Sequence, residues 1–332
     1  MQEFINRLAE LKKAVDRNPR EFMKNLASEL NPKLSTKYRK YFTANKQEIE
    51  PTKIKLELIP VNDTFTDELF KSAMSFWSVP LSAGYGRRMR YIILDKQHYK
   101  VFGIFGLCDP VIGLKVRDDF IGWNREQKQD RLYNILTAYI LGAIPPYNEL
   151  YGSKLVALTV GSKEVSEDFF NKYNGKKTVI KERTPIPKLV AIDTMAFFGK
   201  SLIYEGLREW QFVGFSKGYT HHHLTSLWNE ALELAKKLNL KTLQEETKFN
   251  HGFSWKLRVW NDLFSALKIS KDYLTTEISK GYYFRPLIEN WKEFLTGTID
   301  ETFYINKSFE EYVEYWSSKY MRKRINKFVK NT

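Results

Sequence analysis

Residues 1–50 carry apolar side chains at a spacing of three or four, which is the period of an amphipathic helix. The spacing is set by Leu8, Leu11, Val15, Phe22 and Leu26. Pro19 follows Asn18 and is expected to open a second helix after a break, because proline is favoured at the first helical position. Over residues 53–59 the pattern changes to alternation of polar and apolar residues, which predicts a half-buried strand.

The rest of the chain alternates between apolar runs of strand length and helical spacing. Strands are predicted at residues 89–94, 99–107, 139–144, 188–194 and 210–215. Helices are predicted at residues 66–76 (capped by Thr64 or Thr66), 124–136 (capped by Asn124), 153–160 (or farther, toward residue 173), 199–207 and 226–238. Helical spacing from residue 256 makes the last third mostly helical.

This order of elements predicts an α/β fold, with a mixed central sheet flanked by helices. We expect a helical N-terminal arm at residues 1–52, an α/β core at residues 53–250 and a mostly helical region with a basic tail at residues 251–332.

The charge of the chain indicates what kind of partner it binds. Lysine and arginine number 53 against 39 acids, which gives a formal charge of +14. Residues 319–330 hold six cations and no acid, and residues 31–55 hold seven cations interleaved with aromatic residues. Cations displace the counterions of phosphates and rings stack on bases, so the pattern favours nucleic acid, DNA foremost. A solvated helix surface with a frayed basic terminus is the alternative interpretation.

Other features of the composition narrow the class of protein. No run of 18 apolar residues occurs, and the first residues do not resemble a secretory leader. The one cysteine, Cys108, excludes an internal disulfide and a multi-cysteine metal site. We therefore expect a cytoplasmic protein with no membrane partner.

Two predicted strand–helix turns could hold an anion on free backbone amides. The turn at Gly199 and Lys200 lacks the earlier glycine of a phosphate loop, because Thr194 stands in its place. The second turn offers Asn148, Gly152, Ser153 and Lys154 for a pyrophosphate or phosphodiester. An ordinary turn at the first site and a simple N-cap at Ser153 are the alternatives.

Histidine and tyrosine supply the candidate proton carriers. On a strand, His221 and His223 would share one face, where they could relay protons or bind a metal with His251 or Asp193 as third ligand. We favour the structural or proton-transfer role and predict no metal. Tyr204 could act as a general acid, although packing in the core is the commoner fate of tyrosine.

Arginine is the better clamp for a phosphate, because its planar fork binds two oxygens at once. The candidate phosphate contacts are Arg87, Arg88, Arg117, Lys200, Arg322, Lys323 and Arg324. Asp118 and Asp119 could instead pair with the arginines. The chain shows neither the spaced carboxylates of a two-metal nuclease nor a serine or cysteine nucleophile motif.

A series of short blocks runs through residues 75–300. The blocks are residues 77–80, 84–88, 106–110, 117–123, 141–148, 152–155, 199–204, 218–223, 284–290 and 295–297. In this order they resemble the DruA-like family, which is named after the Druantia anti-phage system. The resemblance implies phage defence or carriage on a mobile element, with other defence-system proteins as partners. Residues 200–202 and 204–206 depart from the family pattern, which weakens one anion site and removes one cation.

The order of strands and helices also resembles the core of Gcn5-related acyltransferases. This resemblance implies that a strand ending at Ile144 splays open for a pantetheine arm and that amides of residues 148–154 hold the pyrophosphate of acetyl-CoA or another acyl-CoA. The nearest match to the acyl-CoA loop misses both of its glycines.

Two functional hypotheses result. In the first, the protein serves anti-phage defence or a mobile element and binds or modifies nucleic acid as an acyltransferase-like enzyme. The enzyme would use Tyr204 as acid, His221 or His223 as proton carrier and Asp193 beside them. In the second, it is a non-catalytic nucleic-acid-binding subunit of a defence complex. A nuclease or transposase component ranks last.

Overall fold

The computed structural model describes residues 2–81, 86–178, 182–217, 222–244 and 253–330. The chain forms two compact units, each built from separate segments. The smaller unit comprises Met1–Leu30, Trp77–Pro80 and Lys217–Lys280, and the larger unit comprises Asn31–Phe76, Leu81–Ser216 and Gly281–Thr332. These boundaries differ from the linear division predicted at residues 52 and 250, because segments distant in sequence bury their apolar faces together.

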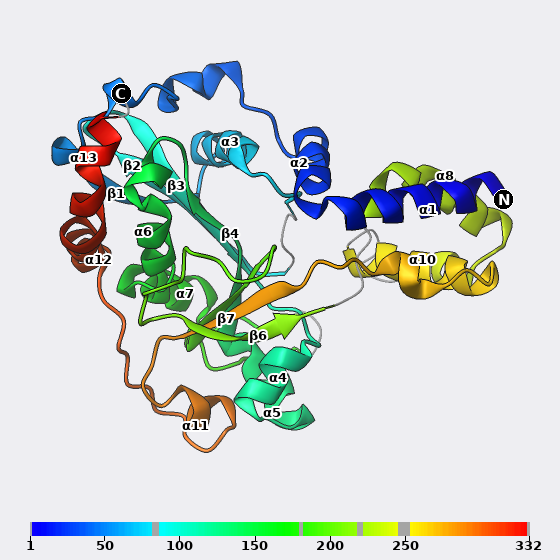
Figure 1. Cartoon of the computed structure of the whole chain (residues 1–332). Coiled ribbons are helices and arrows are strands. Elements are labelled where there is room, and N and C mark those ends of the chain that lie inside the picture. Colours follow the sequence, from blue (N-terminus) through cyan, green and yellow to red (C-terminus); the bar gives the residue numbers. More distant parts are fainter. Residues whose placement is uncertain (1, 82–85, 179–181, 218–221, 245–252, 331–332) are drawn as a thin grey trace. The chain divides into compact units, whose positions relative to one another are not determined.

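The larger unit contains a seven-stranded mixed sheet in the order β1-β2-β3-β4-β5-β7-β6 (Figure 1). Its strands are β1 (Leu56–Pro60), β2 (Arg88–Asp95), β3 (Lys100–Cys108), β4 (Ile135–Ala143), β5 (Ala191–Ala196), β6 (Gln211–Ser216) and β7 (Lys280–Pro286). The first four strands pair antiparallel, β4 and β5 pair parallel, and β5 and β7 pair antiparallel. The predicted α/β fold with a mixed sheet is confirmed.

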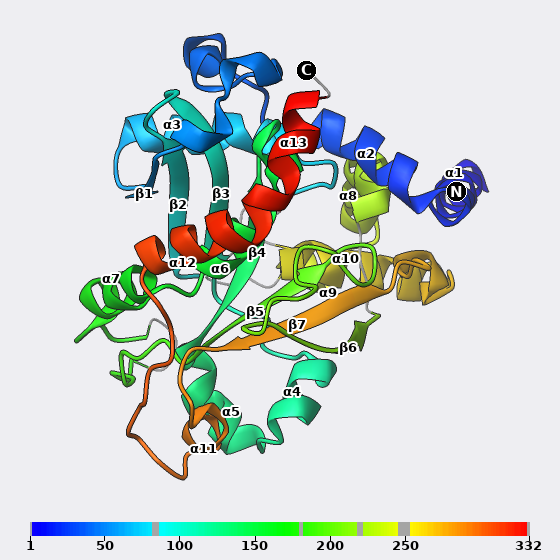
Figure 2. The same cartoon turned by 60° about the vertical axis from the view of Figure 1, so that its left-hand side comes forward.

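Helices pack on both faces of the sheet (Figure 2). The helices of the larger unit are α3 (Thr64–Ala73), α4 (Lys115–Ile121), α5 (Arg125–Arg131), α6 (Gly152–Thr159), α7 (Lys163–Tyr173), α11 (Trp291–Leu295), α12 (Phe309–Trp316) and α13 (Arg322–Lys330). Successive residues of a strand point to opposite faces of the sheet, so β7 contributes to two separate cores. Tyr283 packs in the core with α6, α7 and α12, whereas its neighbours Tyr282 and Phe284 pack in the other core with α4 and α11.

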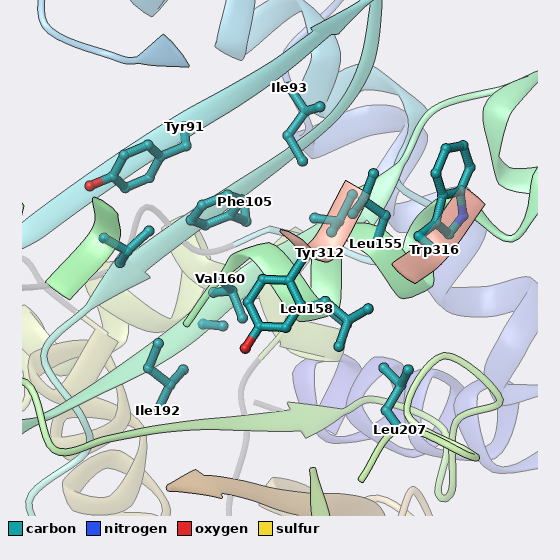
Figure 3. Packing of buried hydrophobic residues seen from close by; sticks show 14 of the residues in the cluster. Tyr91, Ile93, Phe105, Leu155, Leu158, Val160, Ile192, Leu207, Tyr312 and Trp316 are labelled. Atoms are coloured by element: carbon teal, nitrogen blue, oxygen red, sulfur yellow. The ribbon is translucent and has the colours of Figure 1, made fainter. Parts of the chain in front are cut away.

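The main core of the larger unit lies between the sheet and α6, α7, α12 and α13 (Figure 3). Tyr91 and Phe105 stack from neighbouring strands with ring centroids 4.8 Å apart. The buried guanidinium of Arg285 donates to the carbonyls of Ala157 (2.7 Å) and Leu158 (2.5 Å). Those carbonyls belong to the last turn of α6, so Arg285 supplies the hydrogen bonds that a helix end lacks.

The smaller unit is helical in the residues that the structure describes. Its helices are α1 (Gln2–Arg17), α2 (Pro19–Leu30), α8 (Trp228–Lys237), α9 (Lys241–Gln244) and α10 (Phe253–Ala266). Phe4 and Leu8 of α1 pack with Trp260 and other apolar residues of α8 and α10. The predicted break before Pro19 is confirmed. None of the described helices is both long and apolar enough to cross a membrane.

Several local predictions are wrong. Residues 199–207 form turns instead of a helix, because Lys154 draws the carbonyls of Leu202, Ile203 and Glu205 inward. The last third contains β7, whose five consecutive buried residues give no alternating signal. His222–Leu227 is a 3-10 helix, so the condition under which His221 and His223 would share one face of a strand is not met over these described residues.

Helix capping was predicted in part. Asn124 caps α5 in a capping box with Gln127, as expected. This helix ends at Arg131, and a 3-10 turn at Leu132–Asn134 leads from it into β4. At α3 the cap is Asp63, and Thr66 is its partner in the box instead of the cap.

Candidate functional site

The 117–123 block forms a buried polar network at α4. Arg117 has no exposed surface, and it donates to the carbonyls of Val111 (2.7 Å) and Ile112 (3.0 Å). Its Nη2 also donates to Asp118 Oδ1 at 2.9 Å, and Trp123 Nε1 donates to the same oxygen at 3.1 Å. Because these donors are satisfied inside the protein, Arg117 does not lie on a surface that could meet a phosphate.

Asp193 links strands β4, β5 and β7 where β4 and β5 pair in parallel. This β5 side chain accepts hydrogen bonds from Thr137 of β4 and, at 2.9 Å, from the hydroxyl of Tyr282 of β7. Burial raises the pKa of Asp193, because the charged carboxylate is disfavoured away from water. With 2% of its surface exposed, Asp193 ties strands together and has no access for a substrate in this structure.

Tyr204 lies in the 199–207 turns, with its ring packed in the core. The ring centroid is 4.4 Å from that of Tyr283 and 4.9 Å from that of Trp210. Burial raises the pKa of Tyr204, so the phenol remains protonated. The side chain is 7% exposed, which fits the core-packing interpretation at least as well as that of a general acid.

The predicted anion cradle at α6 is closed by its own chain. The Lys154 ammonium donates to the carbonyls of Leu202 (2.8 Å) and Glu205 (2.5 Å), and burial lowers its pKa. A Cβ on Gly152 would lie 2.6 Å from the Tyr147 carbonyl, so backbone already fills that space.

The remaining features of this turn confirm that it is packed. Ser153 Oγ accepts from the Ala143 amide at 3.0 Å, and the Trp316 indole donates to the Tyr151 carbonyl at 3.2 Å. The geometry does not fit the pyrophosphate of an acyl-CoA, and the cofactor role of Asn148, Gly152, Ser153 and Lys154 stays a prediction.

The histidine cluster falls in the smaller unit, whereas Asp193 and Tyr204 belong to the larger one. His223 is 1% exposed, and its Nε2 bonds the Tyr273 carbonyl at 2.7 Å. Burial lowers the pKa of His223 to about 4, so the ring is neutral near pH 7. His221 and His251 lie outside the described residues. Among the residues that are described, no three His, Cys, Asp or Glu side chains gather as a metal site.

Arg87 is held in an aromatic setting. Its Nε donates to Asp109 Oδ1 at 2.6 Å, and its guanidinium carbon lies 3.7 Å from the centroid of the Tyr133 ring. Only 12% of the side chain is exposed, so its charge is mostly engaged within the fold. Arg88 and Lys200 are exposed, and the Lys200 ammonium lies 4.5 Å from the Phe212 ring.

Helix α13 carries a group of exposed cationic side chains. One face of this helix is fixed by Phe328, which is 2% exposed, and by Arg324, whose guanidinium lies 4.3 Å from the Tyr151 ring. The other face presents four exposed cations, Arg322, Lys323, Lys327 and Lys330. None of the four forms an ion pair with a carboxylate in the part of the chain that is described.

The fold brings the two basic segments of the sequence together. α13 packs against the turns Lys46–Glu48 and Tyr147–Leu150, so the basic stretch 31–55 reaches this helix (Figure 1). Lys46 pairs with Glu149 at 2.6 Å and lies 5.9 Å from the Phe328 ring. The sequence predicted both basic segments, but it gave no sign that they share a surface.

The fold and this surface define a basic α/β protein with a buried polar junction and an exposed cationic helix. A family model described as Druantia protein DruA matches residues 8–297, and the chain belongs to the DruA family. Druantia protein DruA from Escherichia coli (strain UMEA 4076-1) is 33% identical over 256 residues, which cover 75% of this chain. The match spans 63% of the relative's own length, and no solved structure matches the chain.

Proposed function

We propose that this chain takes part in anti-phage defence as a nucleic-acid-binding protein whose phosphate contacts lie on α13. Membership of the DruA family supports the defence role, because Druantia is an anti-phage system. The observation that carries the binding role is the acid-free helix Arg322–Lys330, with four exposed cations on one face. Duplex DNA is the ligand, and other defence-system proteins are the expected partners.

The physical basis is the release of counterions. Each cation that neutralises a phosphate of duplex DNA releases condensed counterions, which adds about 0.9 to the slope of log affinity against log salt concentration. Lysines contact phosphates as point charges, without needing a fixed geometry. A helix that presents three lysines and one arginine on one face favours binding that depends steeply on salt and weakly on base sequence.

The test is a DNA-binding titration at several salt concentrations. An α13 variant combines Arg322→Ala, Lys323→Ala, Lys327→Ala and Lys330→Ala, changes that keep helix propensity high. We expect it to bind a labelled duplex more weakly, with a salt slope reduced by about 3 to 4. A charge-matched control combines Lys13→Ala, Lys24→Ala, Lys236→Ala and Lys237→Ala, which are exposed in the smaller unit.

Comparing the α13 variant with the charge-matched control distinguishes binding through a local surface from binding that depends on net charge alone. If both variants lose the same affinity and slope, binding follows total charge and the assignment to α13 is wrong. If neither wild type nor variant binds DNA at low salt, the binding role itself fails. Phage plating on cells that carry the defence system with either variant tests the biological role, and we expect only the α13 variant to lose resistance.

Group transfer is a second candidate, favoured by one observation. β4 and β5 pair in parallel only from Ile135–Thr137 to Ala191–Asp193, although β4 continues to Ala143. Such a divergence is what the acyltransferase resemblance implies for a pantetheine arm. The engaged Lys154 ammonium and the packed Gly152 stand against it, so the binding role is the one that we put forward.

A further inference from the structure

A second surface of the larger unit holds a cavity of about 650 Å³ between α7 and the segment that leads into α12. Figure 2 shows this segment passing beside α7, and two contacts fix it there. The Lys163 amide donates to the Lys307 carbonyl at 3.0 Å, and Asn306 Nδ2 donates to Ser166 Oγ at 3.0 Å. The volume lies within the range typical of small-molecule sites.

Two exposed aromatic rings line the cavity from opposite elements. Phe170 of α7 is 47% exposed, and Tyr304 is 44% exposed. Neither ring contacts another aromatic ring within the described residues. This separates them from most aromatic side chains of the larger unit, which pack in clusters. Exposed rings beside a cavity offer flat faces on which a planar ligand can stack.

The polar lining holds two lysines, Lys163 and Lys188, against one carboxylate, Glu167, together with the amides of Asn171 and Asn306. Among the described residues, the Lys188 ammonium donates only to the Asp300 carbonyl, at 3.0 Å, so no described carboxylate neutralises its charge there. The Lys163 ammonium is 3.5 Å from Glu311 and its side chain is 54% exposed. Asn171 is exposed, and its side chain makes no hydrogen bond with a described residue. A carboxamide can donate to and accept from the edge of a base.

We propose that this cavity binds one nucleotide, with the base in contact with both Phe170 and Tyr304 and the phosphate near Lys163 and Lys188. The combination of rings, a carboxamide and two lysines matches a planar heterocycle that carries an anion. The ligand is a free mononucleotide or an unstacked nucleotide of a single strand, since both present the same chemistry. The site does not depend on α13 and would persist if duplex binding failed.

The test measures binding of AMP, adenosine and a short single-stranded oligonucleotide to the full chain by calorimetry. We expect Phe170→Ala and Tyr304→Ala each to weaken AMP binding about tenfold, the loss of one base-stacking contact. Lys188→Ala should weaken AMP but leave adenosine unchanged, because only AMP carries the phosphate. The matched control is Phe303→Ala, because that ring is 56% exposed beside Tyr304 but does not line the cavity.

The possible outcomes distinguish a free nucleotide from a nucleotide of a single strand, and they include results that would refute the site. AMP binding that falls in the cavity variants and not in Phe303→Ala supports a free nucleotide. Binding of the oligonucleotide alone, with the same sensitivity, supports a strand. Absence of binding by all three probes, or binding that Phe170→Ala and Tyr304→Ala leave intact, overturns the proposal. The α13 variant should retain AMP binding, which separates this site from the proposed duplex contact.

Discussion

The neutral, buried imidazole of His223 makes the stability of the smaller unit depend on pH. Burial is the largest cause of its lowered pKa, and the nearby Lys12 charge acts in the same direction. The hydrogen bond to the Tyr273 carbonyl and the charge of Asp16 oppose it. Replacing the ring by His223→Gln keeps an amide that can donate to that carbonyl but removes the group that titrates.

The magnitude follows from the two pKa values. The pKa is about 4 in the folded chain and 6.5 in its ordinary state, so the unfolded chain binds more protons between these values. The stability that comes from the neutral ring is therefore complete above the ordinary pKa and is lost as the pH falls toward the folded value. Between about pH 7.5 and about pH 5 the loss amounts to about 2 kcal/mol.

Urea unfolding of wild type and His223→Gln at both pH values measures this loss. Brief proteolysis at each urea concentration measures the unfolded fraction of the smaller unit separately, because cleavage within that unit gives fragments of characteristic mass. The stability advantage of wild type over the variant should shrink by about 2 kcal/mol at the lower pH, since all other titrating groups cancel. An advantage that stays constant with pH would refute the reasoning, because the ring would then titrate alike in both states.

Three further changes have expected outcomes. Arg117→Met should lower the free energy of unfolding of the larger unit by about 2–3 kcal/mol in urea, because the carbonyls of Val111 and Ile112 lose their buried donor, whereas Asp118 keeps Lys128 at 3.0 Å. An unchanged midpoint would show that the network does not contribute to stability. Gly86→Ala should cost more than about 1 kcal/mol in thermal unfolding, because φ is +67° and the added Cβ would overlap the Asp109 carboxylate, whereas Gly113→Ala meets no atom and should be mild. Acetyl-CoA should leave the melting temperature unchanged, although a ligand at 100 times its Kd would add about 2.7 kcal/mol; a stabilisation abolished by Lys154→Ala would reverse our interpretation of the α6 turn.

The fold was predictable where the local pattern and the tertiary environment agree. The first strand alternates because Leu56 and Leu58 pack, partly buried, against the main core, and the apolar runs of β2, β3 and β4 are bounded by turn residues. The prediction failed at residues 199–207, where Lys154 from another element sets the conformation. It also failed at β7, because a strand buried on both faces shows no period that distinguishes it from a helix.

The candidate site was predictable only as a charge pattern. In the sequence, Arg117, Lys154 and Lys323 are equivalent cations. In the structure, the first is fully buried, the second donates to backbone carbonyls and the third is exposed. Nothing local to a cation determines which of these environments it meets. The cavity with Phe170 and Tyr304 was missed because its rings lie 134 positions apart and neither sits in a recognisable motif.

The position of the family match bears on where the activity of this chain resides. The match covers residues 8–297, and the polar side chains that we place inside it, Arg117, Asp193 and Arg285, hold strands and helix ends together. Helix α13, on which we place the proposed phosphate contacts, lies beyond residue 297, as does Tyr304 of the proposed nucleotide cavity. These polar side chains inside the family stretch therefore serve the scaffold, and α12 and α13 complete its core from beyond that stretch. The surfaces proposed to meet nucleic acid draw on residues outside that stretch, so both binding proposals must be tested on this chain itself.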